Sequence, residues 1–181
     1  MTVKTLSVAF LSAALLAACQ QGAGFDAPVI PLTGVDAPAD PAEEALAAIC
    51  TGDAALQERM GEAVNAARAA NGKVLLAAND DLIRIAQSHA CDVAAMGRAT
   101  VAGSNGSNVV DRARAVGYPT CGVAQLVAAG GTPEGVVAAW LRSEPHRVEL
   151  MGQSSTELGT GVVRGADGRL WWSVVLGDDC A

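Results

Sequence analysis

The chain has 181 residues, of which 51% are hydrophobic and 17% are charged. This length and composition suit one globular domain with an N-terminal appendage rather than two domains. Twelve basic residues stand against 19 acidic ones, giving a formal net charge of −7, and the basic residues do not cluster along the chain. Because nucleic acid is bound through a concentrated positive surface, we expect no nucleic-acid partner.

Aromatic residues make up only 3% of the chain. Alanine and glycine are abundant, so helices must pack closely through small side chains. Most of the bulk of a core must then come from three tryptophans, Trp140, Trp171 and Trp172. We predict that all three are largely buried.

The first 18 residues have the pattern of an export signal. Lys4 precedes the apolar run LSVAFLSAALLAA, which is too short to cross a bilayer comfortably. The run ends in Leu-Ala-Ala-Cys, which matches a bacterial lipobox and predicts cleavage before Cys19 and acylation of its thiol. The alternatives are an ordinary secretory signal or an uncleaved anchor. Gln20 after the cysteine favours the outer membrane over the inner membrane, with the protein facing the periplasm.

Residues 19–48 are rich in Pro, Gly, Ala and Asp and show no sustained hydrophobic period. They are predicted to form a flexible tether between the lipid and a folded domain at 49–181.

The domain contains four further cysteines, an even number in an exported chain, which predicts two disulfides. Four cysteines allow three pairings, and their positions favour Cys50–Cys180, bracketing the domain, and Cys91–Cys121 within it. A zinc site needs close pairs such as Cys-x-x-Cys, and the sequence has none.

The first half of the domain has helical periodicity. A first helix is expected from Asp53 to Ala70, ended by Asn-Gly. A second begins at a cap, Asn79 or Asp80, and places His89 on its buried stripe, where a packing role is expected rather than a ligand role. A third, short helix lies within 108–119.

The second half alternates strand and helix signals. A strand is predicted over 121–131, and then a helix that is capped by Thr132, has Pro133 at its first position and is stopped by Pro145. An Asp-Gly turn at 167–168 joins the last two strands into an antiparallel hairpin. Glycines at 159, 161 and 165 on this hairpin would let another layer approach closely. The economical architecture is α+β, with helices around a small antiparallel sheet.

Five sequence segments, in their order along the chain, resemble the bacterial branch of the CAP superfamily over about residues 56–177. They are NAARAANGKVLL, NDDLIRIAQSHACDVAAMG, DRARAVGYPTCGVAQLVAAGGTPEGVVAAWLRSEPHR, ELGTGVVRG and LWWSVVLG. That superfamily also includes the cysteine-rich secretory, insect antigen and plant pathogenesis-related proteins. The resemblance implies its three-layer α-β-α sandwich.

Many members of that superfamily have two histidines and two acidic residues that line a central cleft and can hold a divalent metal. The second histidine matches His146. Val101 stands where the first is expected, and Ala124 replaces the first acidic residue. The second acidic position matches Ser143, with Glu144 adjacent but not matched. Only one of the four groups therefore remains.

A lone imidazole is too weak a chelate for a metal site, so no metal and no cofactor are expected. His146 is interpreted as ordering its loop by hydrogen bonding; a residual ligand contact aided by Glu144 or Gln125 is the alternative. A catalytic dyad of Ser143 and His146 is disfavoured, because Pro145 interrupts the helix and no orienting carboxylate is evident.

The resemblance and the export signal together predict a monomeric, lipid-anchored envelope protein that is more plausible as a binding module than as an enzyme. Its partner would be the membrane, through the lipid, and an envelope protein, glycan or lipid of unknown identity. Two alternatives stay open: a protease-like hydrolase that uses the cleft around His146, and a sterol- or fatty-acid-binding protein.

Overall fold

The computed structural model describes residues 46–47, 50–152 and 154–179. The predicted signal peptide, Cys19, nearly all of the predicted tether and Cys180 lie outside these residues.

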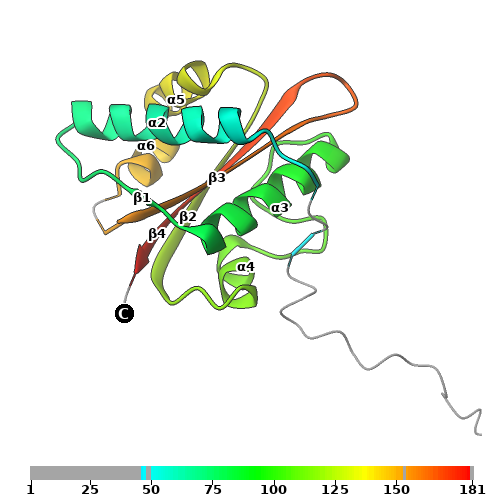
Figure 1. Ribbon diagram of the computed structural model, residues 1–181, viewed down its shortest axis with the longest axis horizontal. Coiled ribbons are helices and arrows are strands. Elements are labelled where there is room, and N and C mark those ends of the chain that lie inside the picture. The colour runs from blue at the N-terminus through cyan, green and yellow to red at the C-terminus, as the bar shows by residue number, and fades with distance from the viewer. Residues whose placement is uncertain (1–45, 48–49, 153, 180–181) are drawn as a thin grey trace, which may run out of the picture. The chain divides into compact units, whose positions relative to one another are not determined.

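Five helices and four strands are formed by the described residues (Figure 1). In chain order they are α2 (Ala54–Ala70), β1 (Ala77–Ala78), α3 (Asp80–Met96), α4 (Val109–Ala115), β2 (Thr120–Ala129), α5 (Pro133–Arg142), α6 (Glu144–Leu150), β3 (Glu157–Arg164) and β4 (Leu170–Asp179).

Three helices begin where the sequence predicts. Asp53 accepts the amide of Leu56 at the start of α2. Asn79 accepts two amides at the start of α3, and Thr132 accepts one at the start of α5. Each cap satisfies amides that have no partner within the helix, so the predicted starts of these helices are confirmed.

The strands form one sheet in the order β1-β3-β4-β2. β3 and β4 form the predicted antiparallel hairpin, and β2 pairs antiparallel with the far side of β4. The predicted antiparallel sheet is formed by these three strands, and at one edge the two-residue β1 adds a parallel pair with β3. Because the link between α2 and α3 runs along β3, the amide of Ala77 reaches the carbonyl of Thr156 at 2.9 Å.

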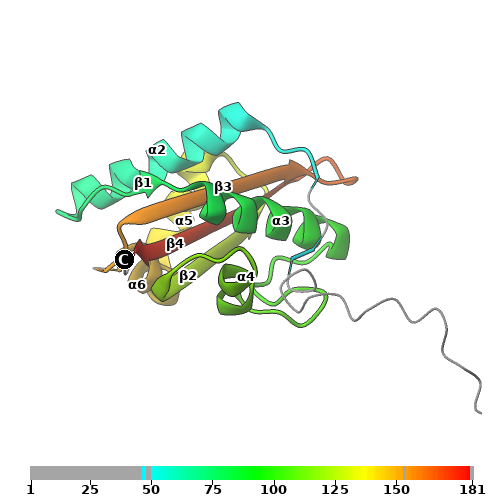
Figure 2. The same cartoon turned by 60° about the horizontal axis from the view of Figure 1, so that its bottom comes forward.

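Helices cover both faces of the sheet, as expected for an α-β-α sandwich. Figures 1 and 2 show α2, α5 and α6 on one face and α3 and α4 on the other. We refer to these as the α5 face and the α3 face.

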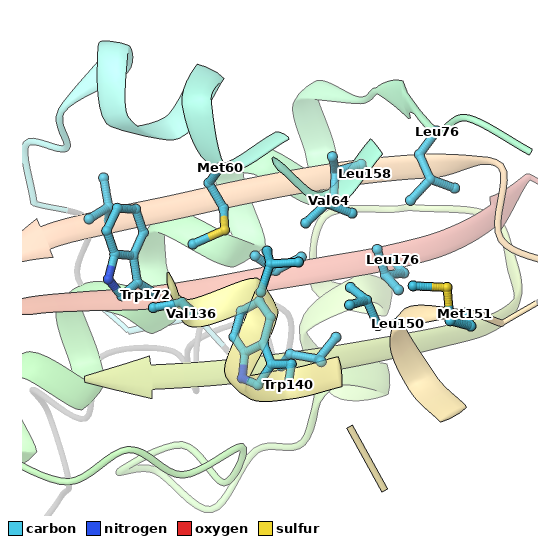
Figure 3. Close-up of a cluster of buried hydrophobic side chains, with 14 residues drawn as sticks. Met60, Val64, Leu76, Val136, Trp140, Leu150, Met151, Leu158, Trp172 and Leu176 are labelled. Atoms are coloured by element: carbon cyan, nitrogen blue, oxygen red, sulfur yellow. The ribbon is translucent and has the colours of Figure 1, made fainter. Parts of the chain in front are cut away.

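The main apolar core lies on the α5 face (Figure 3). Trp172 is fully buried there and Trp140 is 4% exposed, while Met60 and Val64 reach the same cluster from α2. Trp171, on the opposite side of β4, is 1% exposed. The predicted burial of all three tryptophans is confirmed.

On the α3 face, an apolar cluster that includes Leu82, Ile85 and Val175 is combined with direct backbone contact between helix and sheet. A Cβ atom on Gly159 would lie 2.0 Å from the carbonyl carbon of Leu82, and one on Gly161 would lie 2.3 Å from that of Ala86. Both distances are far below any real Cβ contact. The predicted close approach at these two strand glycines is confirmed, because α3 lies directly on β3.

Two side chains one turn apart on α2 secure neighbouring loops. Asn65 donates to the carbonyl of Leu76 and accepts its amide, at 3.0 and 2.9 Å. The buried Arg68 guanidinium donates to four backbone carbonyls, those of Val74, Leu150, Gly152 and Ser155. Burial lowers the pKa of Arg68. These contacts attach the link before β1 and the segment after α6 to the same helix.

Pro145 does not simply stop α5. That helix ends at Arg142, and α6 begins at Glu144 with Pro145 in its first turn. The missing amide of proline is harmless in a first turn, where amides have no partner within the helix. The predicted stop is therefore also the start of a helix that the sequence analysis missed.

The predicted cysteine pairing is wrong. Cys50 is joined to Cys91, so neither Cys50–Cys180 nor Cys91–Cys121 forms. The segment that enters α2 runs along α3, where Ser88 donates to the carbonyl of Ala47, and this path brings Cys50 to Cys91. Cys121 is also disulfide-bonded.

Candidate functional site

The start of α6 brings together three of the four residues predicted for the site. Ser143 is the residue between α5 and α6, and its side chain makes no capping bond to the backbone. Its hydroxyl instead lies 2.7 Å from Nδ1 of His146, in an exposed position. His146 thus makes a local hydrogen bond at the start of the helix, and its structural role stays a prediction.

Glu144 faces the next turn of α6 rather than the imidazole. Its two carboxylate oxygens accept three hydrogen bonds of 2.7–2.9 Å from the guanidinium of Arg147. Both side chains are about half exposed or more, so this is a surface ion pair. The carboxylate that could orient His146 is thus engaged by a neighbouring cation.

Gln125, the fourth predicted residue, lies on the opposite face of the sheet. It is 8% exposed and accepts a hydrogen bond from Nη2 of Arg112 on α4, while its amide donates to Ser173 on β4 at 2.9 Å. Ala124, its neighbour on β2, packs against the core of the α5 face. Because successive strand residues point to opposite faces, Gln125 cannot join a site built around Ala124, and its inclusion with His146 is wrong.

The two apolar replacements inferred from the CAP resemblance also differ in their surroundings. Val101 is 52% exposed, and its carbonyl accepts a hydrogen bond from Arg112 at 2.9 Å. Ala124 is partly buried. Among the described residues, no group of three or more His, Cys, Asp or Glu side chains could hold a metal ion.

A buried polar cluster beneath the α3 face was not found by sequence reasoning. It contains Arg112 and His89, each 1% exposed, and Asp92, which is 7% exposed. Burial lowers the pKa of Arg112 to about 10, and the nearby Asp92 and Asp111 partly offset this effect. Arginine and aspartate are seldom buried, so their presence here identifies an organised polar centre.

His89 is the neutral member of that cluster. Its pKa is lowered to about 4, first by burial and then by the charge of Arg112, while the carbonyl of Thr100 and the carboxylate of Asp92 act in the opposite direction. The predicted position of His89 on the buried stripe of its helix is confirmed. The helical pattern predicted that His89 is buried, but it did not predict its charged neighbours. These are Arg112 on α4 and Asp92, which lies one turn further along α3.

The geometry around His146 could support only limited chemistry. A hydroxyl 2.7 Å from an imidazole nitrogen is within the reach of a nucleophile and its base. Such pairs act when a third group orients the base, and here Glu144 is paired with Arg147. The site is better suited to hydrogen bonding with a ligand than to turnover.

None of the helices in the described part of the chain is long and apolar enough to span a membrane.

Known proteins were compared with the chain in three ways. The family model described as the cysteine-rich secretory protein family, CAP, matches residues 62–176. No curated protein matches.

Solved structures give matches to the fold. An outer surface protein of Borrelia burgdorferi is 19% identical with a TM-score of 0.63; the match covers 67% of this chain and 91% of that one. An extracellular protein of Bacillus anthracis that contains an SCP domain is 21% identical with a TM-score of 0.60, over 68% of this chain and 40% of that one. A cysteine-rich secretory protein of Staphylococcus aureus is 19% identical with a TM-score of 0.56, over 68% and 38%.

The chain thus spans most of the first of these proteins and about two fifths of the other two. At these identities the likeness shows the fold, and it agrees with the three layers described above. The family model covers more than half of the residues and includes both the α6 site and the buried cluster. The chain therefore belongs to the cysteine-rich secretory protein family and carries its CAP domain.

Proposed function

We propose that this protein is a non-catalytic CAP-domain binding module, held by a lipid on Cys19 at the periplasmic side of a bacterial membrane. The observation that carries the non-catalytic part is the separation of its polar groups. His146 has Ser143 as its hydrogen-bond partner, Glu144 is paired with a cation, and Gln125 lies beneath the other face of the sheet.

Three features support export and anchoring. The lipobox ends at Cys19, the Cys50–Cys91 disulfide suits an oxidising compartment, and a protein of the same fold is described as an outer surface protein. Acylation supplies more than one chain to the anchor, and two or more chains hold a protein stably on a membrane.

Membrane fractionation tests the anchor. Cys19→Ala should be left unprocessed or lose membrane retention, and the mass of the wild-type N-terminal peptide should include the acyl groups. Gln20→Ala, which keeps the lipobox, is the matched control for processing. Unchanged membrane retention and unchanged mass in Cys19→Ala would rule out the anchor.

The 2.7 Å contact between Ser143 and His146 favours one rival function, a hydrolase that uses this pair. Peptide and ester hydrolysis should be measured for the wild type, Ser143→Ala and His146→Ala, with Val148→Ser on the same helix as the control. We expect no turnover that depends on either residue. Hydrolysis lost in both site variants but kept in the control would replace the binding proposal by the hydrolase.

The ligand class can be sought without an assumption about its chemistry. Cross-linking in intact cells with Cys19 present, followed by purification of the adducts, should recover an envelope protein or glycan. The adducts should diminish when α6 carries His146→Ala together with Ser143→Ala. Adducts that are unaffected by these changes would place the binding surface elsewhere on the domain.

A further inference from the structure

The loop of residues 97–108, which joins α3 to α4, is held from below by buried polar side chains of α3. Nε2 of His89 lies 2.7 Å from the carbonyl of Thr100, and because a carbonyl only accepts, Nε2 carries the proton. Oδ2 of Asp92 accepts the amide of Ser104 at 2.8 Å. Two points of the loop are therefore fixed by neighbouring turns of one helix.

Arg112 of α4 holds the same loop from the other side. Its guanidinium donates to the carbonyls of Val101 and Ser107, each at 2.9 Å, and to the Ser107 hydroxyl at 2.9 Å. Gln125 orients the guanidinium from the sheet. The loop is closed only while α3, α4 and β2 all present these groups in one arrangement.

The charges beneath the loop are balanced only if His89 is neutral. The two charged residues that act on its ring are Arg112 from α4 and Asp92 from α3, and Asp111 acts in turn on Arg112. The sheet contributes the uncharged side chain of Gln125 to the cluster. A proton on the imidazole would place two cations against one buried anion, in surroundings where unpaired charge is costly.

The guanidinium of Arg112 cannot offset a positive charge on His89. Nε of Arg112 is buried and has no hydrogen-bond partner among the described atoms, so the existing cation is already incompletely satisfied. A second buried cation beside it would have to be relieved by movement that admits water.

The element best able to move is the loop. α3 is fixed by direct backbone contact with β3 at Gly159 and Gly161. The loop, by contrast, exposes Val101 and most of the residues from 102 to 106, and its main attachments to the helices are the polar contacts described above. Loss of these contacts would release the loop and leave the sheet and its apolar core in place.

We propose that His89 is an acid-sensitive latch, whose protonation releases loop 97–108 from α3 and α4 and opens the polar side of β2 at Gln125. This device acts independently of the lipid anchor and of the α6 site. It would change the surface of the domain when the surroundings of the cell become acidic.

The direction of the pH effect follows from the change in proton binding. An unfolded or released His89 has its ordinary pKa of 6.5, and the closed form lowers this pKa to about 4. The closed form therefore binds fewer protons between these values, and its stability falls as the pH is lowered from about 6.5 to about 4. Above this window the closed loop keeps its full stability.

Hydrogen exchange of the full purified chain, measured at several pH values and corrected for intrinsic exchange rates, tests the latch. Protection of the amides of Gly103 and Ser104 should fall by roughly ten- to a hundredfold between pH 6.5 and pH 4, because each unit of pKa difference corresponds to about tenfold. The amides of β3 and β4 should keep their protection. No selective loss in the loop would overturn the proposal.

Two variants identify the group that titrates. His89→Gln keeps a side-chain donor for the carbonyl of Thr100 but cannot become charged, so protection of its loop should not change across this window. His146→Gln removes the other histidine of the chain, which is exposed, and should keep the wild-type response. An unchanged acid response in His89→Gln would assign the effect to another group and sink the latch.

A spectroscopic measurement on the wild type covers the case in which His89→Gln does not fold. The ring signals of His89 should titrate with the same midpoint as the loss of loop protection. Two separate midpoints for ring and loop would refute the coupling.

Discussion

The two faces of the sheet are stabilised in different ways. On the α5 face, large apolar side chains such as Trp140 and Trp172 fill the space between helices and sheet. On the α3 face, helix backbone lies against the strand glycines, and Arg112 and Gln125 hydrogen-bond beneath the loop. The first face depends on buried area and should tolerate swaps that conserve volume. The second depends more on close backbone approach and on buried hydrogen bonds, so small changes there should be costly.

The largest expected effect comes from adding one methyl group to the α3 face. Gly161→Ala would put its Cβ 2.3 Å from the backbone of Ala86, so α3 would have to move. We expect a loss of about 3 kcal/mol or more in the free energy of unfolding, measured by urea denaturation. Gly61→Ala is the control, because its Cβ would make an ordinary 3.5 Å contact with Leu158. Equal stability of the two variants would contradict the close contact of α3 with β3.

Removal of the Arg68 guanidinium, which attaches two segments to α2, should have the next largest effect. Arg68→Ala leaves four carbonyls without their donor and opens a cavity, with an expected cost of about 3 kcal/mol in the same assay. Arg59→Ala on the same helix breaks an exposed ion pair with Glu134 and should cost less than about 1 kcal/mol. A small effect of Arg68→Ala would mean that water replaces the guanidinium without loss.

A pair of neighbours on β2 compares the two faces directly. Gln125→Leu strands a donor of Arg112 and the hydroxyl of Ser173, which should cost about 2 kcal/mol. Leu126→Met, on the α5 face, conserves volume and should cost less than about 1.5 kcal/mol. If the order of the two variants is reversed in thermal and urea unfolding, the proposed difference between the faces is wrong.

The smallest effect is expected at the surface of α6. Glu144→Gln removes an exposed ion pair with Arg147, and the free energy of unfolding should change by no more than about 0.5 kcal/mol. Added salt should reduce even this difference. A larger loss that persists in high salt would show that Glu144 supports the site in a way other than through Arg147.

Local signals in the sequence predicted much of the fold. Helical periodicity placed the start of α2, the caps at Asn79 and Thr132 placed the starts of α3 and α5, and the Asp-Gly turn placed the hairpin. These signals act within a few residues. Pro145 was misread because proline both follows a helix end and opens a helix, and sequence alone does not distinguish the two uses.

The site was predicted less well because its composition depends on which residues share a face. The alternation of side chains along a strand separates Gln125 from Ala124, and this rule, applied to β2, would have removed Gln125 from the site. Burial of Arg68 had a signal too, since it continues the buried spacing of Met60 and Val64 along α2. No signal in the sequence indicated the Cys50–Cys91 pairing, because it depends on the path of the chain before the first helix.

The carboxamide of Asn65 has a consequence beyond holding one loop. Next to the edge of the sheet, it hydrogen-bonds with both the amide and the carbonyl of Leu76, as the backbone of an additional strand would do. A neighbouring polypeptide therefore finds no ladder to extend at that residue. Pairing with another sheet through that position would first require displacement of the Asn65 side chain.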